Sequence, residues 1–219
     1  MTKLYLVRHG ETFDNERQIM QGQTQGELNA TGIRQAEALS RQLADVHFDA
    51  VVASDLWRSV HTARILAEPH GLEVVTTPLL RERDWGSFTG RFIPDLQNIK
   101  PWPNDIETAP QMKVRARRFL DFLRREYPES AVLAVGHGII NKAILSVYAG
   151  CTMREVQRMM NAEVRVLSTS AVAMSATTTA ACTAVRTATA TSAEGTAAVA
   201  AESTAAVAAA ERAAAVSAE

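Results

Sequence analysis

Two histidines that end short apolar runs are the residues of this sequence best suited to chemistry. His9 follows Arg8 at the end of the run 4–7, and His137 lies between two glycines after the run 131–135. Such runs predict buried strands, and α/β folds bind their ligands at the carboxyl ends of parallel strands. A guanidinium can hold two oxygens of a phosphate while an adjacent imidazole attacks the phosphorus. The pair Arg8–His9 therefore indicates phosphoryl chemistry at a sheet edge.

A further segment should bring another cation to the same edge. Arg58 falls in the first turn of a helix expected after the apolar segment 48–54, which is itself predicted to be a strand. Together with Arg8, His9 and His137 it would place four basic groups close together. These groups would repel one another unless an anion lay among them, so a bound phosphate is the simplest account of their convergence.

A phosphate ester also needs a proton for its departing oxygen, so a general acid is expected near the site. The segment 80–90 offers Glu82 and Asp84. A carboxylic acid in a low-dielectric pocket beside a phosphate keeps its proton nearer to neutral pH than one in water. The residue types alone leave both candidates open.

The elements that position these residues alternate between strand and helix. Strands are expected at 4–7, 48–54, 73–77, 131–135 and 163–167, and helices at 31–45, 56–67, 111–127, 139–148 and 152–160. This alternation predicts a mainly parallel sheet with helices on both faces, that is, a three-layer α/β/α sandwich. The proline-rich segment 78–110 interrupts the alternation and is expected to form an irregular rim rather than core.

Charge and composition argue against several classes of protein. The formal net charge is −1, so no overall field attracts nucleic acid or an anionic membrane. The amphipathic pattern of 111–127 puts its arginines on a solvated outer face: Arg115, Arg117, Arg118, Arg124 and Arg125. Cys151 and Cys182 lack metal-ligand spacing. No membrane span and no signal peptide are expected, which favours a cytoplasmic protein with no nucleic-acid or membrane partner.

The 219 residues are expected to form one folded domain at 1–168 and a tail at 169–219. The tail consists mostly of Ala, Thr, Ser and Val, with a rough repeat towards its end. Such a composition cannot bury enough apolar surface to offset the entropy lost on ordering. We therefore expect the tail to be disordered or partly helical and to lie outside the fold.

The order of motifs along the chain resembles the histidine phosphatase superfamily, the phosphoglycerate mutase-like enzymes. The matching segments cover about residues 3 to 168 and are Arg8-His9-Gly10-Glu11-Thr12 with Asn15 downstream, Leu28 to Gly32 with Gln35-Ala36, Ser54 to Ala63, Leu80 and Glu82 with Gly86 and Gly90, Glu107 with Arg115, Gly136-His137-Gly138, and Asn161. This resemblance implies a phosphoglycerate mutase-like fold and a phosphoryl-transfer activity on a small phosphorylated substrate.

The resemblance also implies roles for individual residues. His9 would be the nucleophile that carries a transient phosphoryl group. Four side chains and one backbone position would hold the phosphoryl oxygens: Arg8, Asn15, Arg58, His137 and Gly138. Glu82 would protonate the leaving oxygen and then activate water, which makes Asp84 the weaker candidate. No metal and no cofactor are implied, and the oligomeric state is left open.

Three alternatives to a phosphomonoester hydrolase remain at this stage. A phosphoglycerate mutase would pass the phosphoryl group to a substrate hydroxyl instead of water. A non-catalytic module could keep the anion pocket without turnover. Lastly, the tail could be the functional interaction element and the domain its carrier. The leaving group would be recognised by residues 83–110, so the sequence does not name the substrate.

Overall fold

Five strands form the central sheet: β1 (Thr2–Arg8), β2 (Ala50–Ser54), β3 (Val74–Thr77), β4 (Ala131–Gly136) and β5 (Val164–Thr169). Their order is β3-β2-β4-β1-β5. The first four pair in parallel, and β5 runs antiparallel to β1. The computed structural model describes residues 1–169. The expected mainly parallel sheet is confirmed, whereas the predicted tail, apart from the last residue of β5, lies outside the described residues.

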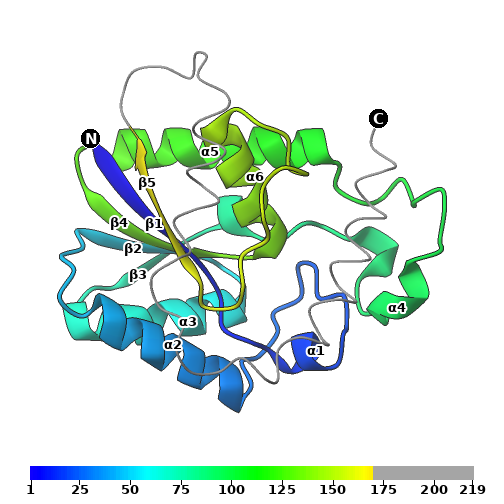
Figure 1. Ribbon diagram of the computed structural model, residues 1–219, viewed down its shortest axis with the longest axis horizontal. Coiled ribbons are helices and arrows are strands. Elements are labelled where there is room, and N and C mark those ends of the chain that lie inside the picture. Colours follow the sequence, from blue (N-terminus) through cyan, green and yellow to red (C-terminus); the bar gives the residue numbers. More distant parts are fainter. Residues whose placement is uncertain (170–219) are drawn as a thin grey trace.

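Helices cover both faces of this sheet (Figure 1). One face carries α5 (Ala109–Glu126) and α6 (Gly138–Ala149), and the other carries α2 (Ala30–Leu43) and α3 (Trp57–Ala67). The side chains of β1 alternate between the two layers, because successive strand residues point to opposite faces. Leu4 and Leu6 pack with the α5–α6 side, and Tyr5 and Val7 pack with the α2–α3 side. The predicted three-layer α/β/α sandwich is confirmed.

Side-chain caps mark the amino ends of α2 and α5. The Asn29 side chain accepts a hydrogen bond from the backbone N–H of Gly32 and so begins α2. Thr108 and Gln111 form a capping box at the start of α5. Short elements not expected from the sequence are α1 (Phe13–Glu16), α4 (Ile93–Leu96) and 3-10 turns at Glu68–His70, Pro78–Leu80 and Gly86–Phe88. None of the helices described is long and apolar enough to cross a bilayer.

The helix predicted at 152–160 is wrong, because this segment forms only turns. The turn begins as a helix would, since Thr152 N–H donates to the carboxylate of Glu155 at 2.8 Å. It does not continue as a helix, and two carbonyls near the end of the segment accept from arginine side chains. Arg165 Nη1 donates to the Gln157 carbonyl at 3.0 Å, and Arg8 Nη1 donates to the Met159 carbonyl at 2.8 Å.

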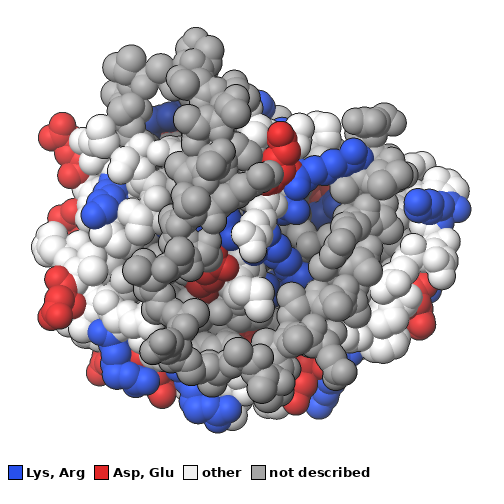
Figure 2. All heavy atoms as spheres, viewed as in Figure 1, with Lys and Arg blue, Asp and Glu red and all other residues white. Residues whose placement is uncertain are grey.

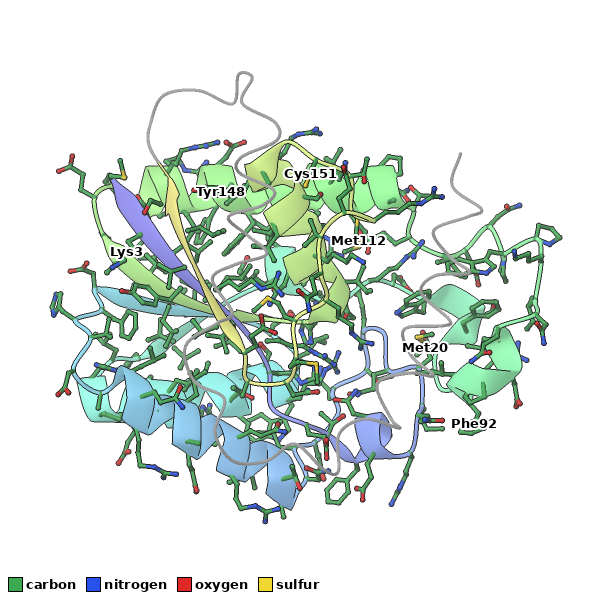
Figure 3. The ribbon with its side chains drawn as sticks, viewed as in Figure 1. Lys3, Met20, Phe92, Met112, Tyr148 and Cys151 are labelled. Atoms are coloured by element: carbon green, nitrogen blue, oxygen red, sulfur yellow. The ribbon has the colours of Figure 1, made fainter. Side chains whose placement is uncertain are left out.

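The segment 78–110 is irregular as expected, but the prediction that it stays out of the core is wrong. Its apolar side chains are buried in the same cluster as α5 and α6: Leu80, Trp85, Phe88, Leu96 and Ile106. It is also joined to the segment after β1. Met20 N–H donates to the Arg91 carbonyl at 2.9 Å, and Ile19 forms an isolated bridge with Phe92. Figure 3 shows Met20 and Phe92 on the side of the molecule near α4.

Two glycines allow the chain after β1 to pass against the start of α2. A Cβ atom on Gly10 would lie 2.4 Å from the carbonyl oxygen of Gly32, and one on Gly32 would lie 2.0 Å from the carbonyl oxygen of Glu11. The same contact is reinforced by Gln35, whose side-chain oxygen accepts from the Glu11 N–H at 2.9 Å. This packing fixes the backbone immediately after His9.

We expect Gly32→Ala to lower the free energy of unfolding by about 2 kcal/mol, because backbone must move to admit the methyl group and overpacking costs of this order outweigh the better helix propensity of alanine. Urea denaturation measures the change. Glu37→Ala, at an exposed position of the same helix, should stay within about 0.5 kcal/mol of the parent protein. A Gly32→Ala protein as stable as the parent would contradict the packing described.

Candidate active site

The two predicted histidines meet at the carboxyl ends of neighbouring strands. Arg8 at the end of β1 is in register with Gly136 at the end of β4, and the residues that follow are His9 and His137. Their ring centroids lie 5.0 Å apart. Both side chains are buried, His9 with 3% and His137 with 0% of its surface exposed. The sequence-based placement of the two imidazoles at one sheet edge is confirmed.

His9 is held as the tautomer that a nucleophile at Nε2 requires. Its Nδ1 lies 2.7 Å from the carbonyl oxygen of Gly10. A carbonyl only accepts, so Nδ1 carries the proton and Nε2 keeps its lone pair in the neutral ring. Burial, followed by the charges of Arg58 and Arg8, holds the pKa of His9 well below its ordinary value. The ring is therefore neutral at neutral pH, with its lone pair on Nε2.

His137 has the opposite tautomer. Arg58 Nε donates to His137 Nδ1 at 3.2 Å, so the proton of the neutral ring is on Nε2. This buried Nε2 has no hydrogen-bond partner among the described residues. Burial is the main cause that lowers the pKa of His137, and the charge of Arg58 adds to it. One imidazole thus presents a lone pair and the other an N–H donor.

Arg58 also fixes the loop that follows α1. Its Nη1 donates to the Thr24 carbonyl at 2.6 Å and the Gln25 carbonyl at 3.2 Å, and its Nη2 donates to the Gly22 carbonyl at 2.9 Å. Burial lowers the pKa of Arg58 to about 10, so the guanidinium remains charged at neutral pH. A second N–H on Nη2 can still be offered to a phosphate, and that contact stays a prediction.

Glu82 lies at the amino end of α6, beside His137. Its carboxylate accepts from the backbone N–H groups of Ile139 at 3.1 Å, Ile140 at 3.2 Å and Arg83 at 2.8 Å. The amino end of a helix favours negative charge, so a carboxylate and a phosphate group would both be stabilised there. Glu82 is therefore placed at the same edge as the histidines, whereas Asp84 bonds the backbone N–H of Gly86 at 2.9 Å.

Glu107 and Arg115 hold the Glu82 segment in place. Arg115 donates to the Glu107 carboxylate at 2.7 and 3.0 Å, and to the carbonyls of Leu79 and Glu82 at 3.3 Å each. It bonds the Arg81 carbonyl as well. The prediction that Arg115 lies on the outer face of its helix is wrong, since only 16% of its side chain is exposed. The arginine turns inwards because these carbonyls have no helical or strand partners.

Asn15 and Asn161 tie the two sides of the site together. Asn161 Nδ2 donates to the His9 carbonyl at 3.0 Å and to Asn15 Oδ1 at 3.4 Å. Asn15 Oδ1 also accepts from the Thr12 N–H at 3.3 Å. The oxygen of Asn15 is thus used within the protein, so a contact with phosphate would come from its NH2 group. Gly138, the first residue of α6, follows His137 directly.

One cation at the site was missed by the sequence analysis. A Cβ atom built on Gly138 would lie 3.6 Å from Arg158 Nε, 3.6 Å from Glu82 Oε2 and 3.7 Å from Arg8 Nε. Arg158 comes from the segment wrongly predicted to be a helix, and no motif marks it. Figure 2 shows basic side chains gathered near the middle of this face. Within residues 1–169 no group of three or more His, Cys, Asp or Glu is placed to hold a metal ion.

Comparison with known families agrees with this geometry. The histidine phosphatase superfamily (branch 1) matches residues 4–180. This chain therefore belongs to the histidine phosphatase superfamily. Phosphatase PhoE of Bacillus subtilis (strain 168), itself uncharacterized, is 37% identical over 154 residues, which are 68% of this chain and 79% of PhoE. The probable phosphoglycerate mutase GpmB of Yersinia pestis (strain Pestoides F) is 31% identical over 172 residues, 73% of this chain and 80% of GpmB.

Solved structures give the same result. The mycobacterial glucosyl-3-phosphoglycerate phosphatase Rv2419c superposes with a TM-score of 0.69 at 27% identity, covering 75% of this chain and 88% of that one. A putative alpha-ribazole-5'-P phosphatase from Escherichia coli str. K-12 substr. MG1655 superposes with a TM-score of 0.71 at 27% identity, covering 78% and 92%. The fold class inferred from the sequence is thereby confirmed.

We expect nitrogen NMR of the free protein to show His9 neutral at pH 6.5 with its proton on Nδ1. An imidazole with the unperturbed pKa of about 6.5 would be half protonated there. Because the folded-state pKa is lowered, protonation should begin only at more acid pH. The acid limb of kcat/KM that reports His9 should likewise lie below pH 6.5. A His9 ring that is half protonated at pH 6.5, or protonated on Nε2 when neutral, would refute the assignment.

Proposed function

We propose that this protein hydrolyses phosphomonoesters of small metabolites through a phosphohistidine on His9. The observation that carries the proposal is the hydrogen bond from His9 Nδ1 to the Gly10 carbonyl, which directs the Nε2 lone pair into the site. The tautomer of His137 supports the proposal, because its buried Nε2–H can donate to an anionic oxygen of the substrate. The names of PhoE, Rv2419c and the ribazole phosphatase point to the same class of reaction.

In the first step His9 Nε2 attacks the phosphorus, and the P–N bond forms as the bond to the ester oxygen breaks. That oxygen takes the proton of the Glu82 carboxyl group and leaves as an alcohol. The bound phosphate must therefore supply the negative charge that favours the protonated carboxyl, against the three backbone N–H groups that favour its carboxylate. Arg8, Arg58 and the Nε2–H of His137 stabilise the charge on the three transferred oxygens. We assign the Asn15 NH2 group and the Gly138 backbone N–H to the same oxygens.

In the second step water attacks the phosphorus of the phosphohistidine. The Glu82 carboxylate, left without its proton by the first step, accepts a proton from this water, and the P–N bond breaks. Inorganic phosphate leaves and His9 is regenerated with its lone pair. The catalytic domain in this proposal is residues 1–168, and its place of action is the cytoplasm, where small phosphorylated metabolites are held.

Phosphoglycerate mutase action is the second candidate, favoured by the name of GpmB. A mutase must retain its intermediate long enough to phosphorylate it again, which requires several groups fixed on the substrate. The segment from Gly90 to the start of α5 at Ala109 is short and holds only the single turn of α4. A short rim of this kind favours water as the acceptor, so we rank hydrolysis first.

His9→Ala should reduce phosphate release at least about a thousandfold, because it removes the attacking atom. The parent protein should acquire label from a phosphate-labelled substrate and lose it on acid quenching, since a phosphoramidate is acid-labile. His61→Ala is the matched control, because His61 stacks on Trp57 in α3 with ring centroids 5.7 Å apart and takes no part in the site. Full activity in His9→Ala, or an acid-stable adduct, would exclude the mechanism. No turnover and no label in the parent protein would favour a binding module.

Incubation with 3-phosphoglycerate distinguishes the two candidates on one preparation. We expect release of inorganic phosphate to exceed formation of 2-phosphoglycerate by at least about tenfold, a difference of roughly 1.4 kcal/mol between the two barriers. Phosphorus NMR follows both products together. Efficient isomerisation with little free phosphate would establish the mutase reading instead.

A further inference from the structure

Arg158 lies at the site, but the proposed reaction gives it no role. Its Nε and Glu82 Oε2 each lie 3.6 Å from the same point, the Cβ position of Gly138, and Arg8 Nε lies 3.7 Å from it. A cation and the proton donor of the proposed reaction therefore both lie next to this one position. In the proposed reaction Glu82 marks where the ester oxygen departs. Arg8, at a similar distance, is assigned to the transferred oxygens, so Arg158 is the cation of this group that is left for the leaving-group side.

Arg158 acts more weakly on the two histidines than the other two arginines of the site do. Arg58 and Arg8 each contribute to lowering the pKa of both His9 and His137. Arg158 is the weakest of the charges acting on His9, and it is not among the causes that lower the pKa of His137. This weak action on the histidines agrees with the position of Arg158 beside Glu82.

The backbone on both sides of Arg158 is held rigidly. Val156 and Met159 are buried, and the Met159 carbonyl accepts from Arg8 Nη1 at 2.8 Å. Arg165, itself 2% exposed and paired with Glu163 at 2.8 Å, donates to the Gln157 carbonyl at 3.0 Å. A side chain on a segment anchored in this way can be presented to a ligand without a large loss of conformational entropy.

We propose that Arg158 is a specificity-determining residue that binds an anionic group, best a carboxylate, on the carbon that bears the ester oxygen of the substrate. A guanidinium suits this task because it forms paired hydrogen bonds with a planar carboxylate. The preferred leaving groups are then 2-hydroxy acids and not neutral alcohols. This inference rests on the proposed function, because Glu82 identifies the leaving-group side.

The decisive substrates are 2-phospholactate and isopropyl phosphate, which differ by a carboxylate in place of a methyl group. Neither has a second hydroxyl, so isomerisation cannot intervene. The full chain should prefer 2-phospholactate in kcat/KM. Arg158→Gln should reduce that preference by about tenfold to a hundredfold, mainly through KM, since a hydrogen bond between charged groups contributes this much. Arg158→Lys should restore part of it. Turnover of isopropyl phosphate should change little.

Arg154→Gln is the matched control, an arginine of the same segment that is exposed to solvent; it should leave the preference unchanged. An equal loss on both substrates in Arg158→Gln would overturn the inference, because Arg158 would then act on the phosphoryl group or on Glu82. No loss on either substrate would overturn it as well.

Calorimetric binding separates this inference from the proposed function. In a His9→Ala background, which prevents turnover, 2-phospholactate should bind more tightly than isopropyl phosphate, and Arg158→Gln should abolish the difference. If the parent chain hydrolysed neither ester but this binding difference were found, hydrolysis would be wrong and the role of Arg158 would stand. Equal binding of the two esters with Arg158 present would overturn that role regardless of turnover.

Discussion

The arrangement of this site is governed by the burial of positive charge. A guanidinium keeps its proton at neutral pH, so Arg8 and Arg58 remain charged there although both are buried. The two imidazoles between them can lose a proton, and they do so because a further buried positive charge would be costly. Neutral imidazoles have tautomers, and the neighbouring groups select them. The Gly10 carbonyl selects one for His9, and Arg58 selects the other for His137. The chemical difference between two histidines of the same type thus follows from electrostatics.

Arginine side chains also hold the irregular parts of the molecule in place. Arg58, Arg115 and Arg165 each donate to carbonyl groups of segments that lack helix or strand partners. A guanidinium has five donors in a fixed plane, so one side chain can satisfy several carbonyls and orient the backbone that carries them. The loop after α1, the Glu82 segment and the segment around Arg158 are each fixed in this manner. The site is therefore assembled from loops that have defined positions without regular secondary structure.

The sequence predicted the parts of the site that lie at strand ends. The prediction failed where hydrogen bonds from distant side chains set the course of the backbone. His9, His137 and Arg58 could be placed because an apolar run of the right length ends at one edge of a parallel sheet. Glu82 could be placed only by resemblance, since its segment has no periodic pattern. The helix expected at 152–160 had a suitable pattern, but the segment forms turns whose last carbonyls bond the side chains of Arg8 and Arg165. These bonds include one between residues far apart in sequence, Arg8 and Met159, which no local sequence pattern predicts. Arg158 was missed for the same reason. The inward turn of Arg115 and the burial of Trp85 and Phe88 were likewise decided by tertiary contacts.

The buried N–H of His137 has a consequence for the protein in a cell. A donor that meets no partner within the described fold binds any anionic oxygen of the right shape, and inorganic phosphate has the same oxygens as the group being transferred. Inorganic phosphate, the product of the proposed hydrolysis, therefore competes with each new substrate molecule for the same donors. In the proposed reaction, free phosphate is expected to act as a competitor of the substrate, and this follows from the same donor that stabilises the transferred group.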